Sequence, residues 1–76
     1  MNNARRKMLK QAADLIAEAR EIIEVAKEEE EGAFENLPEG VKCCGRGLEM
    51  EENIYSMENL IEIMEDAETT LEYMAG

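Results

Sequence analysis

Carboxylates are the most abundant side chains capable of chemistry here, and they gather in the last third of the chain. Residues 47–76 contain nine acidic residues and no basic residue. Glu51, Glu58, Glu65 and Glu72 recur every seven residues, which on a helix puts successive carboxylates about 10.5 Å apart on one line. Pairs such as Glu58–Glu62 lie four residues apart, where like charges destabilise a helix. The row is therefore either a solvated face or a contact for something basic.

We take the second reading as the sharper hypothesis, in which the acidic face imitates a phosphate backbone and occupies a basic protein surface. The predicted partner-binding residues are Glu51, Glu58, Glu62, Glu65, Asp66 and Glu72. The formal net charge of −11 disfavours direct contact with nucleic acid, whose phosphates would be repelled. The same charge favours a protein partner with a basic surface.

Residue types that carry out catalysis are scarce. The chain has no histidine, and its one serine, Ser56, has no base at a suitable spacing. The "GRG" at 45–47 is too short to cradle a phosphate. A di-iron bundle site needs Glu-x-x-His motifs, which this chain lacks. We therefore expect no enzymatic activity, no metal and no cofactor.

Two adjacent cysteines, Cys43 and Cys44, lie among turn residues near Lys42 and Arg46. Nearby cations make a thiolate more available, so a redox role is one alternative. A dimer could also bring four sulfurs together for zinc. We favour two incidental thiols of a reducing cytoplasm, because adjacent cysteines bridge poorly. No apolar run long enough for a membrane span or signal peptide occurs, so we expect a cytoplasmic protein.

Two long helices must position these side chains. We predict a helix over 3–36, capped by Asn3, a joint over 37–47, and a second helix over 48–75. The first helix has apolar residues spaced alternately by four and three, which indicates a packing seam. This predicted seam is Met8, Ala12, Leu15, Ala19, Ile22, Ala26 and Ala33, with a parallel row of Leu9, Ile16 and Ile23 beside it. The predicted seam of the second helix is Met50, Ile54, Met57, Ile61, Met64 and Leu71, interrupted by Glu68 and flanked by Leu60, Ala67 and Met74.

A short joint makes the two helices antiparallel neighbours, so we predict an all-α, two-helix hairpin. The predicted register puts Ala33 beside Leu48 and Met8 beside Tyr73. It brings the basic residues Arg5, Arg6, Lys7 and Lys10 near Glu68 and Glu72. With these seams, the extra apolar rows of the two helices fall on opposite sides of the hairpin. We therefore predict a homodimer that forms a four-helix bundle. The predicted packing residues are Leu9, Ile16, Ile23, Ile54, Met57, Leu60, Ile61 and Met64.

Three segments of the chain resemble small proteins encoded in phages and prophages of Gram-positive bacteria. They read "NNARRKML", "EEEEGAFENLPEGV" and "GRGLEMEENIYSMENLIEIME". Those proteins have a helix, an "NxPE" turn and an "RG" before a second acidic helix. The joint matches at Asn36, Leu37, Pro38, Glu39, Arg46 and Gly47, whereas Cys43 and Cys44 depart from it. The resemblance implies a phage context and a helical hairpin, without implying a chemistry.

Together these features predict a non-enzymatic acidic protein of phage or prophage origin. We expect it to inhibit a host or bacterial defence protein by occupying a basic surface that normally binds nucleic acid or a subunit. The alternative is a structural or adaptor coiled coil, which would bind a partner helix through its apolar stripes.

Overall fold

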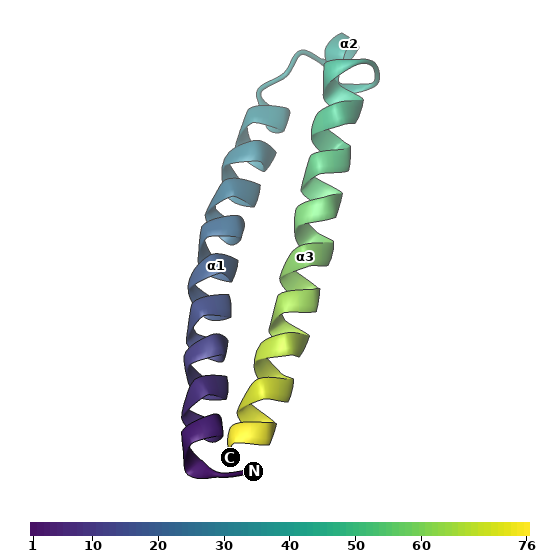
Figure 1. Cartoon of the computed structure of the whole chain (residues 1–76). Coiled ribbons are helices and arrows are strands. Elements are labelled where there is room, and N and C mark those ends of the chain that lie inside the picture. Colours follow the sequence, from purple (N-terminus) through teal and green to yellow (C-terminus); the bar gives the residue numbers. More distant parts are fainter.

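The computed structural model describes residues 1–76 and consists of three helices, with no strand. These are α1 (Asn3–Glu35), α2 (Glu39–Lys42) and α3 (Arg46–Ala75). The long helices α1 and α3 run antiparallel side by side, with α2 at one end of the rod and both termini at the other (Figure 1). The rod measures 58 × 14 × 13 Å between Cα atoms. The predicted all-α hairpin of two packed helices is confirmed.

The ends of α1 follow from its sequence. Asn2 is the N-cap, one residue before the predicted cap, and its side-chain oxygen accepts a hydrogen bond from the Arg5 amide at 2.9 Å. Such a bond satisfies one of the free amides of the first turn. Gly32 does not end the helix, which continues to Glu35 and stops before Pro38. Pro38 restricts Leu37 to extended conformations, so the helix cannot continue through it.

The joint between the long helices contains the helical turn α2, which the sequence did not predict. Pro38 presents a carbonyl that accepts hydrogen bonds from the amides of both Val41 and Lys42, at 2.9 and 3.1 Å. Gly45 then adopts φ 51° and ψ −110°, and the Gly47 amide donates to the Cys44 carbonyl at 3.1 Å. These angles match the first central position of a type II′ turn, which favours glycine. The turn starts α3 at Arg46, two residues before the predicted Leu48.

One row of residues on each long helix forms the contact between α1 and α3, and we call these the inner rows. Every member is buried or half-buried, and the spacing alternates between four and three. The inner row of α1 is Leu9, Ala13, Ile16, Arg20, Ile23, Lys27, Glu30 and Phe34. The inner row of α3 is Met50, Ile54, Met57, Ile61, Met64, Glu68, Leu71 and Ala75. The core is thus a single seam between two helices.

The predicted seam of α3 agrees with its inner row, but the predicted seam of α1 is wrong by one residue. Met8, Leu15 and Ile22 are 66%, 58% and 70% exposed. The inner row uses the neighbouring residues Leu9, Ile16 and Ile23, which we had assigned to contacts with a second copy. Both rows have the same spacing, so periodicity alone does not separate them.

The predicted register is also wrong. Tyr73, predicted to lie beside Met8, is 87% exposed. Glu68 does not meet the basic first turns of α1; its carboxylate accepts from Arg20 Nε at 2.6 Å and from Arg20 Nη2 at 3.3 Å. The charged members of the α1 inner row explain the shift, because each finds a partner across the seam. Lys27 lies 3.7 Å from Glu58, and Glu30 accepts a hydrogen bond from Asn53 at 3.2 Å.

The Arg20–Glu68 pair is the least exposed polar contact between the helices. Its side chains are 23% and 12% exposed, and Glu24 joins Arg20 at 2.6 Å from the same helix. The hydrogen bonds that Arg20 donates to Glu68, and then to Glu24, raise the pKa of its guanidinium above the ordinary value. The arginine therefore stays charged at any physiological pH, and its planar fork fixes how the helices align.

Neither long helix contains a stretch apolar enough to cross a membrane.

Candidate functional site: an acidic flank and an apolar flank

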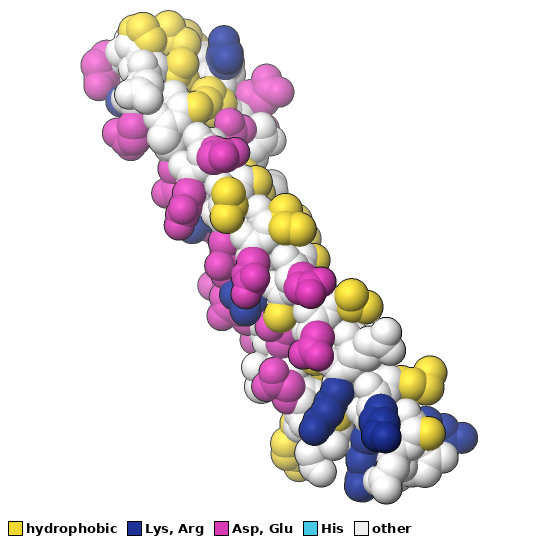
Figure 2. Space-filling model, turned by 90° about the vertical axis from the view of Figure 1, so that its left-hand side faces the viewer, with side chains coloured by type: hydrophobic (Ala, Val, Ile, Leu, Met, Phe, Trp, Pro, Cys, Tyr) yellow, Lys and Arg dark blue, Asp and Glu magenta, His cyan; other side chains and the backbone are white.

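The hairpin has two long sides that differ completely in chemistry. On each helix, the residue that follows each inner-row member in the sequence projects to one side of the rod, and the residue that precedes each member projects to the other. Because α1 and α3 are antiparallel, the residues that follow the inner row of α1 and those that follow the inner row of α3 lie on the same side of the rod. Figure 2 views α1 from outside, and acidic side chains gather toward one edge while hydrophobic ones follow the other.

The first side, which we call the acidic flank, carries eleven carboxylates contributed by both long helices. Its members are Asp14, Glu21, Glu24, Glu28, Glu31 and Glu35 from α1, and Glu51, Glu58, Glu62, Glu65 and Glu72 from α3. Each is exposed or half-exposed. Lys10, which follows Leu9 of the inner row, is the one basic residue on this flank. So many like charges on one side of a narrow rod produce a strongly negative surface potential.

The predicted acidic face is thus half of a larger surface. Glu51, Glu58, Glu62, Glu65 and Glu72 all lie on the acidic flank, exposed to solvent. Asp66 does not, because it falls midway between Met64 and Glu68 of the inner row and so faces outward from α3. The α1 carboxylates were missed although Asp14, Glu21, Glu28 and Glu35 also recur every seven residues, because the predicted α1 seam put them on the outward side of the helix. Each of these carboxylates directly follows a member of the observed inner row of α1.

Two cations of the inner row partly balance this surface. Lys27 Nζ lies 3.7 Å from both Glu31 and Glu58, so it bridges the two helices. Arg20 pairs with Glu24 of the flank as well as with Glu68. The remaining α3 carboxylates of the flank, those of Glu51, Glu62, Glu65 and Glu72, form no ion pair. Their charge is available to an external partner.

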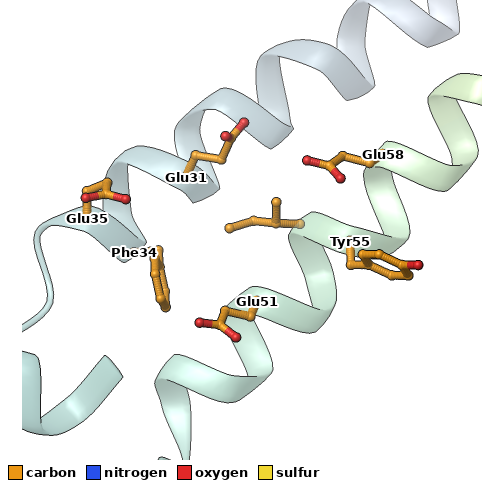
Figure 3. Close-up of a pocket in the computed structure, with 7 residues that line it drawn as sticks. Glu31, Phe34, Glu35, Glu51, Tyr55 and Glu58 are labelled. Carbon is orange, nitrogen blue, oxygen red and sulfur yellow. The ribbon is translucent and has the colours of Figure 1, made fainter. Parts of the chain in front are cut away.

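A hollow of about 200 Å³ opens on the acidic flank near the joint. Its lining is Glu31, Phe34, Glu35, Glu51, Ile54, Tyr55 and Glu58. Figure 3 shows Glu31 and Glu58 reaching toward each other from the two helices, with Phe34 between Glu35 and Glu51. An apolar floor ringed by carboxylates suits a lysine or arginine side chain. Its methylene stem would pack on Phe34 and Ile54 while its cationic head meets the carboxylates.

The opposite side, which we call the apolar flank, has no charged residue over most of its length. Its members along this uncharged part are Met8, Ala12, Leu15, Ala19, Ile22 and Ala26 from α1, and Ser56, Leu60, Ile63, Ala67, Thr70 and Met74 from α3. Toward the joint, the same side continues with Ala33, Asn53 and the two carboxylates Glu29 and Glu49. The predicted seam of α1 and the flanking row of α3 therefore lie together. We had placed the extra apolar rows on opposite sides, and the one-residue correction in α1 removes that conflict.

The two ends of the rod carry the remaining candidate groups. Cys43 and Cys44 are free and exposed at the joint, and their thiols donate to the carbonyls of Glu39 and Gly40 at 3.4 Å. No three His, Cys, Asp or Glu side chains are placed so that together they could hold a metal ion. At the other end are exposed basic residues that form no ion pair: Arg5, Arg6, Lys7 and Lys10. They are the dark blue cluster at the lower end of Figure 2.

Comparison with known proteins assigns no family. No protein-family model matches the chain, and no curated protein or solved structure matches it. The two flanks are therefore interpreted from their own geometry and charge.

Proposed function

We propose that this chain is a non-enzymatic binding protein whose acidic flank occupies a basic surface of another protein. The observation that carries the proposal is the placement of eleven carboxylates from α1 and α3 on one side of the rod. A surface of this kind attracts a basic partner over a distance of about one Debye length, roughly 8–10 Å at physiological ionic strength. It also speeds the encounter between the two proteins.

The hollow near the joint supports a specific contact within this broad attraction. Charge alone would bind many basic proteins weakly, whereas a hollow takes one side chain in one position. Arginine is enriched among the residues that dominate protein interfaces, and it stacks on aromatic rings such as Phe34. We expect one arginine or lysine of the partner to enter the hollow beside Phe34 and to pair with Glu51, which forms no ion pair within the chain.

The biological setting that we propose is a phage or prophage protein that inhibits a host or bacterial defence protein. The joint residues that resemble small phage proteins support this setting. A surface that binds nucleic acid is basic, so an acidic rod has the charge needed to cover it. The proposed activity is occupancy of that surface, which requires no catalysis and no cofactor.

The proposal includes a homodimer in which two hairpins form a four-helix bundle. Large apolar side chains left exposed on one side of the hairpin support it, chiefly Met8, Leu15, Ile22 and Ile63. Soluble monomers rarely leave a continuous apolar surface of this kind uncovered. Packing through the apolar flank would keep both acidic flanks free.

Paired charge reversals test the acidic flank. The variant Glu62→Lys/Glu65→Lys changes two flank residues that form no ion pair. The matched control Glu52→Lys/Asp66→Lys makes the same change in net charge on the outward side of α3. Both tagged variants and the original chain are used to capture proteins from a bacterial lysate at low and high salt, and circular dichroism checks the helix content.

We expect the original chain and the control to capture the same basic protein at low salt, and the flank variant to lose it. High salt should release that protein from the chain, because screening weakens attraction between exposed charges. Equal capture by the flank variant would show that the acidic flank is not the contact.

A second candidate function is an adaptor that binds a partner helix through its apolar stripes, and the exposed apolar flank favours it. Burial of apolar surface depends little on salt, so this partner would remain bound at high salt. The variant Ile22→Glu would release it, while Glu62→Lys/Glu65→Lys would not.

A further inference from the structure

The apolar flank offers a continuous surface on which a second protein can pack. Its uncharged part runs from Met8 to Ala26 on α1 and from Ser56 to Met74 on α3, about 27 Å along each helix at 1.5 Å per residue. Isoleucine, leucine and methionine on this side are more than half exposed at Met8, Leu15, Ile22 and Ile63. Charged side chains are absent between Met8 and Ala26 and between Ser56 and Met74 on this flank. The surface has the composition of an interface core.

We infer that a second copy of this chain covers the apolar flank, and that the two rods lie antiparallel. The inference rests on the dimer proposed above and adds its surface and its orientation. A symmetric dimer brings the same surface of each copy together, so that surface must complement itself in both shape and charge.

Shape complementarity comes from the rows of small and large residues on α1. Ala12, Ala19 and Ala26 form a shallow row that allows another helix to approach closely. Leu15 and Ile22 stand beside that row and project from it. In an antiparallel dimer, the two-fold axis passes near the middle of the rod, close to Ala19 and Ile22. The large side chains of one copy then meet the alanine row of the other.

Charge decides the orientation. The first part of α1 carries the unpaired cations Arg5, Arg6, Lys7 and Lys10 with no acidic residue through position 13. On the apolar flank itself, Arg5 lies one turn before Met8, and the carboxylates of Glu29 and Glu49 lie toward the joint; none of the three forms an ion pair. A parallel dimer would place Arg5 beside Arg5 and the carboxylates beside one another. An antiparallel dimer places Arg5 of each copy near Glu29 and Glu49 of the other, which steers the pair into that orientation.

The dimer would also determine how the acidic flanks are displayed. Each apolar flank is opposite an acidic flank on its own hairpin, so covering the first leaves the second on the outside. The bundle would then carry two acidic flanks on opposite faces, related by the two-fold axis. Such an object can hold two copies of a basic partner, or two sites of a symmetric partner.

The native thiols of the joint provide a test of orientation. The variant Cys44→Ser leaves Cys43 as one exposed thiol per chain, to which a nitroxide spin label is attached. Sedimentation equilibrium gives the mass, and pulsed electron spin resonance gives the distance between labels. We expect a dimer with a label distance close to the 58 Å length of the rod. A parallel dimer would bring the labels within roughly 20 Å, about two interhelical spacings.

A matched pair of substitutions tests the surface. Ile22→Glu places a charge on the apolar flank, whereas Val25→Glu places the same charge on the outward face of α1, where Val25 is 56% exposed. Both side chains are exposed in the hairpin, so neither change disturbs its core. We expect Ile22→Glu to weaken dimerisation about thirtyfold or more, as for a central interface residue, and Val25→Glu to leave it unchanged.

Either a monomer at tens of micromolar or a short label distance would overturn the inference. Equal effects of the two glutamate substitutions would overturn the assigned surface. The capture experiment with Glu62→Lys/Glu65→Lys remains a separate test, because those residues lie on the acidic flank. Loss of the dimer with retained salt-sensitive capture would therefore reject this inference and leave the binding function standing.

Discussion

Replacement of Gly47 by alanine should destabilise the hairpin through a clash with backbone atoms, which the same change at the other glycines of the joint does not cause. Gly47 is buried where α2 packs against the first turn of α3. A Cβ atom there would lie 2.4 Å from the Lys42 carbonyl oxygen and 2.5 Å from that of Val41. Both neighbours are backbone atoms, so no change of side-chain rotamer relieves the contact. Either α2 must move away or the first turn of α3 must unwind.

The expected cost follows from these distances. Inserting a carbon into a well-packed site typically costs about 1–3 kcal/mol, and a clash with backbone belongs at the upper end. A domain of 76 residues has a total stability of roughly 4–11 kcal/mol. Each kcal/mol lowers the melting temperature of a domain this small by about 4–8 °C. We therefore expect Gly47→Ala to melt roughly 10–20 °C below the original chain.

Two other glycines of the joint serve as controls. Gly40 has nothing within 4 Å of its added Cβ and lies in α2, so Gly40→Ala should leave stability unchanged or raise it by about 0.5–1 kcal/mol. Gly45 also has open space, but its φ of 51° with ψ of −110° is unfavourable for alanine, so Gly45→Ala should cost about 1–3 kcal/mol. The ranking separates the effect of a clash from the effect of backbone conformation.

The assay is thermal unfolding followed by far-ultraviolet circular dichroism. All variants must be compared at one protein concentration, because self-association would make the melting temperature depend on it. If Gly47→Ala melts with the original chain while Gly45→Ala is destabilised, α2 does not pack against α3 as described.

Other predictions concern the seam and its polar pair. Ile61 is buried, so Ile61→Ala should cost about 2–4 kcal/mol in urea unfolding, whereas Ile63→Ala, on the apolar flank, should cost less than about 1 kcal/mol in the monomer. Similar costs at the two sites would contradict the assigned inner row of α3. Glu68→Gln removes the carboxylate that accepts from Arg20, so it should lower the melting temperature. Glu65→Gln, at an exposed carboxylate without an ion pair, should leave the melting temperature unchanged or raise it, and the reverse order would show that the pair is not stabilising.

The α3 half of the molecule could be predicted from sequence because its apolar residues occupy one row. Met50, Ile54, Met57, Ile61 and Met64 have no competing row of the same length, so helix geometry alone identifies the buried side. Once that side is known, the neighbouring carboxylates follow. The exposed acidic row of α3 therefore came directly from its spacing.

The α1 half could not be predicted in the same way, because two adjacent rows have the same spacing. The row with four alanines is apolar at every position except Glu29, whereas the row that packs includes Arg20, Lys27 and Glu30. Those charged residues are tolerated in the seam because α3 offers Glu68, Glu58 and Asn53 opposite them. That compensation depends on register, and register depends on both helices together.

The joint was the least predictable part for a related reason. A helix of four residues such as α2 has too few hydrogen bonds to be stable alone. Its position is set by contacts with the start of α3, where Gly47 allows the two backbones to meet. Nothing within residues 37–47 alone indicates that contact.

The Arg20–Glu68 pair has a consequence for how the chain tolerates change. A seam that repeats every seven residues would let one helix slide along the other in whole repeats with little penalty. Sliding by one repeat would bring Arg20 opposite Ile61 or Ala75, which would leave the Glu68 carboxylate without its partner and Arg20 with Glu24 alone. The pair therefore favours the observed register over one shifted by seven residues. Insertions or deletions in the segment between α1 and α3 should leave the alignment of the two helices unchanged.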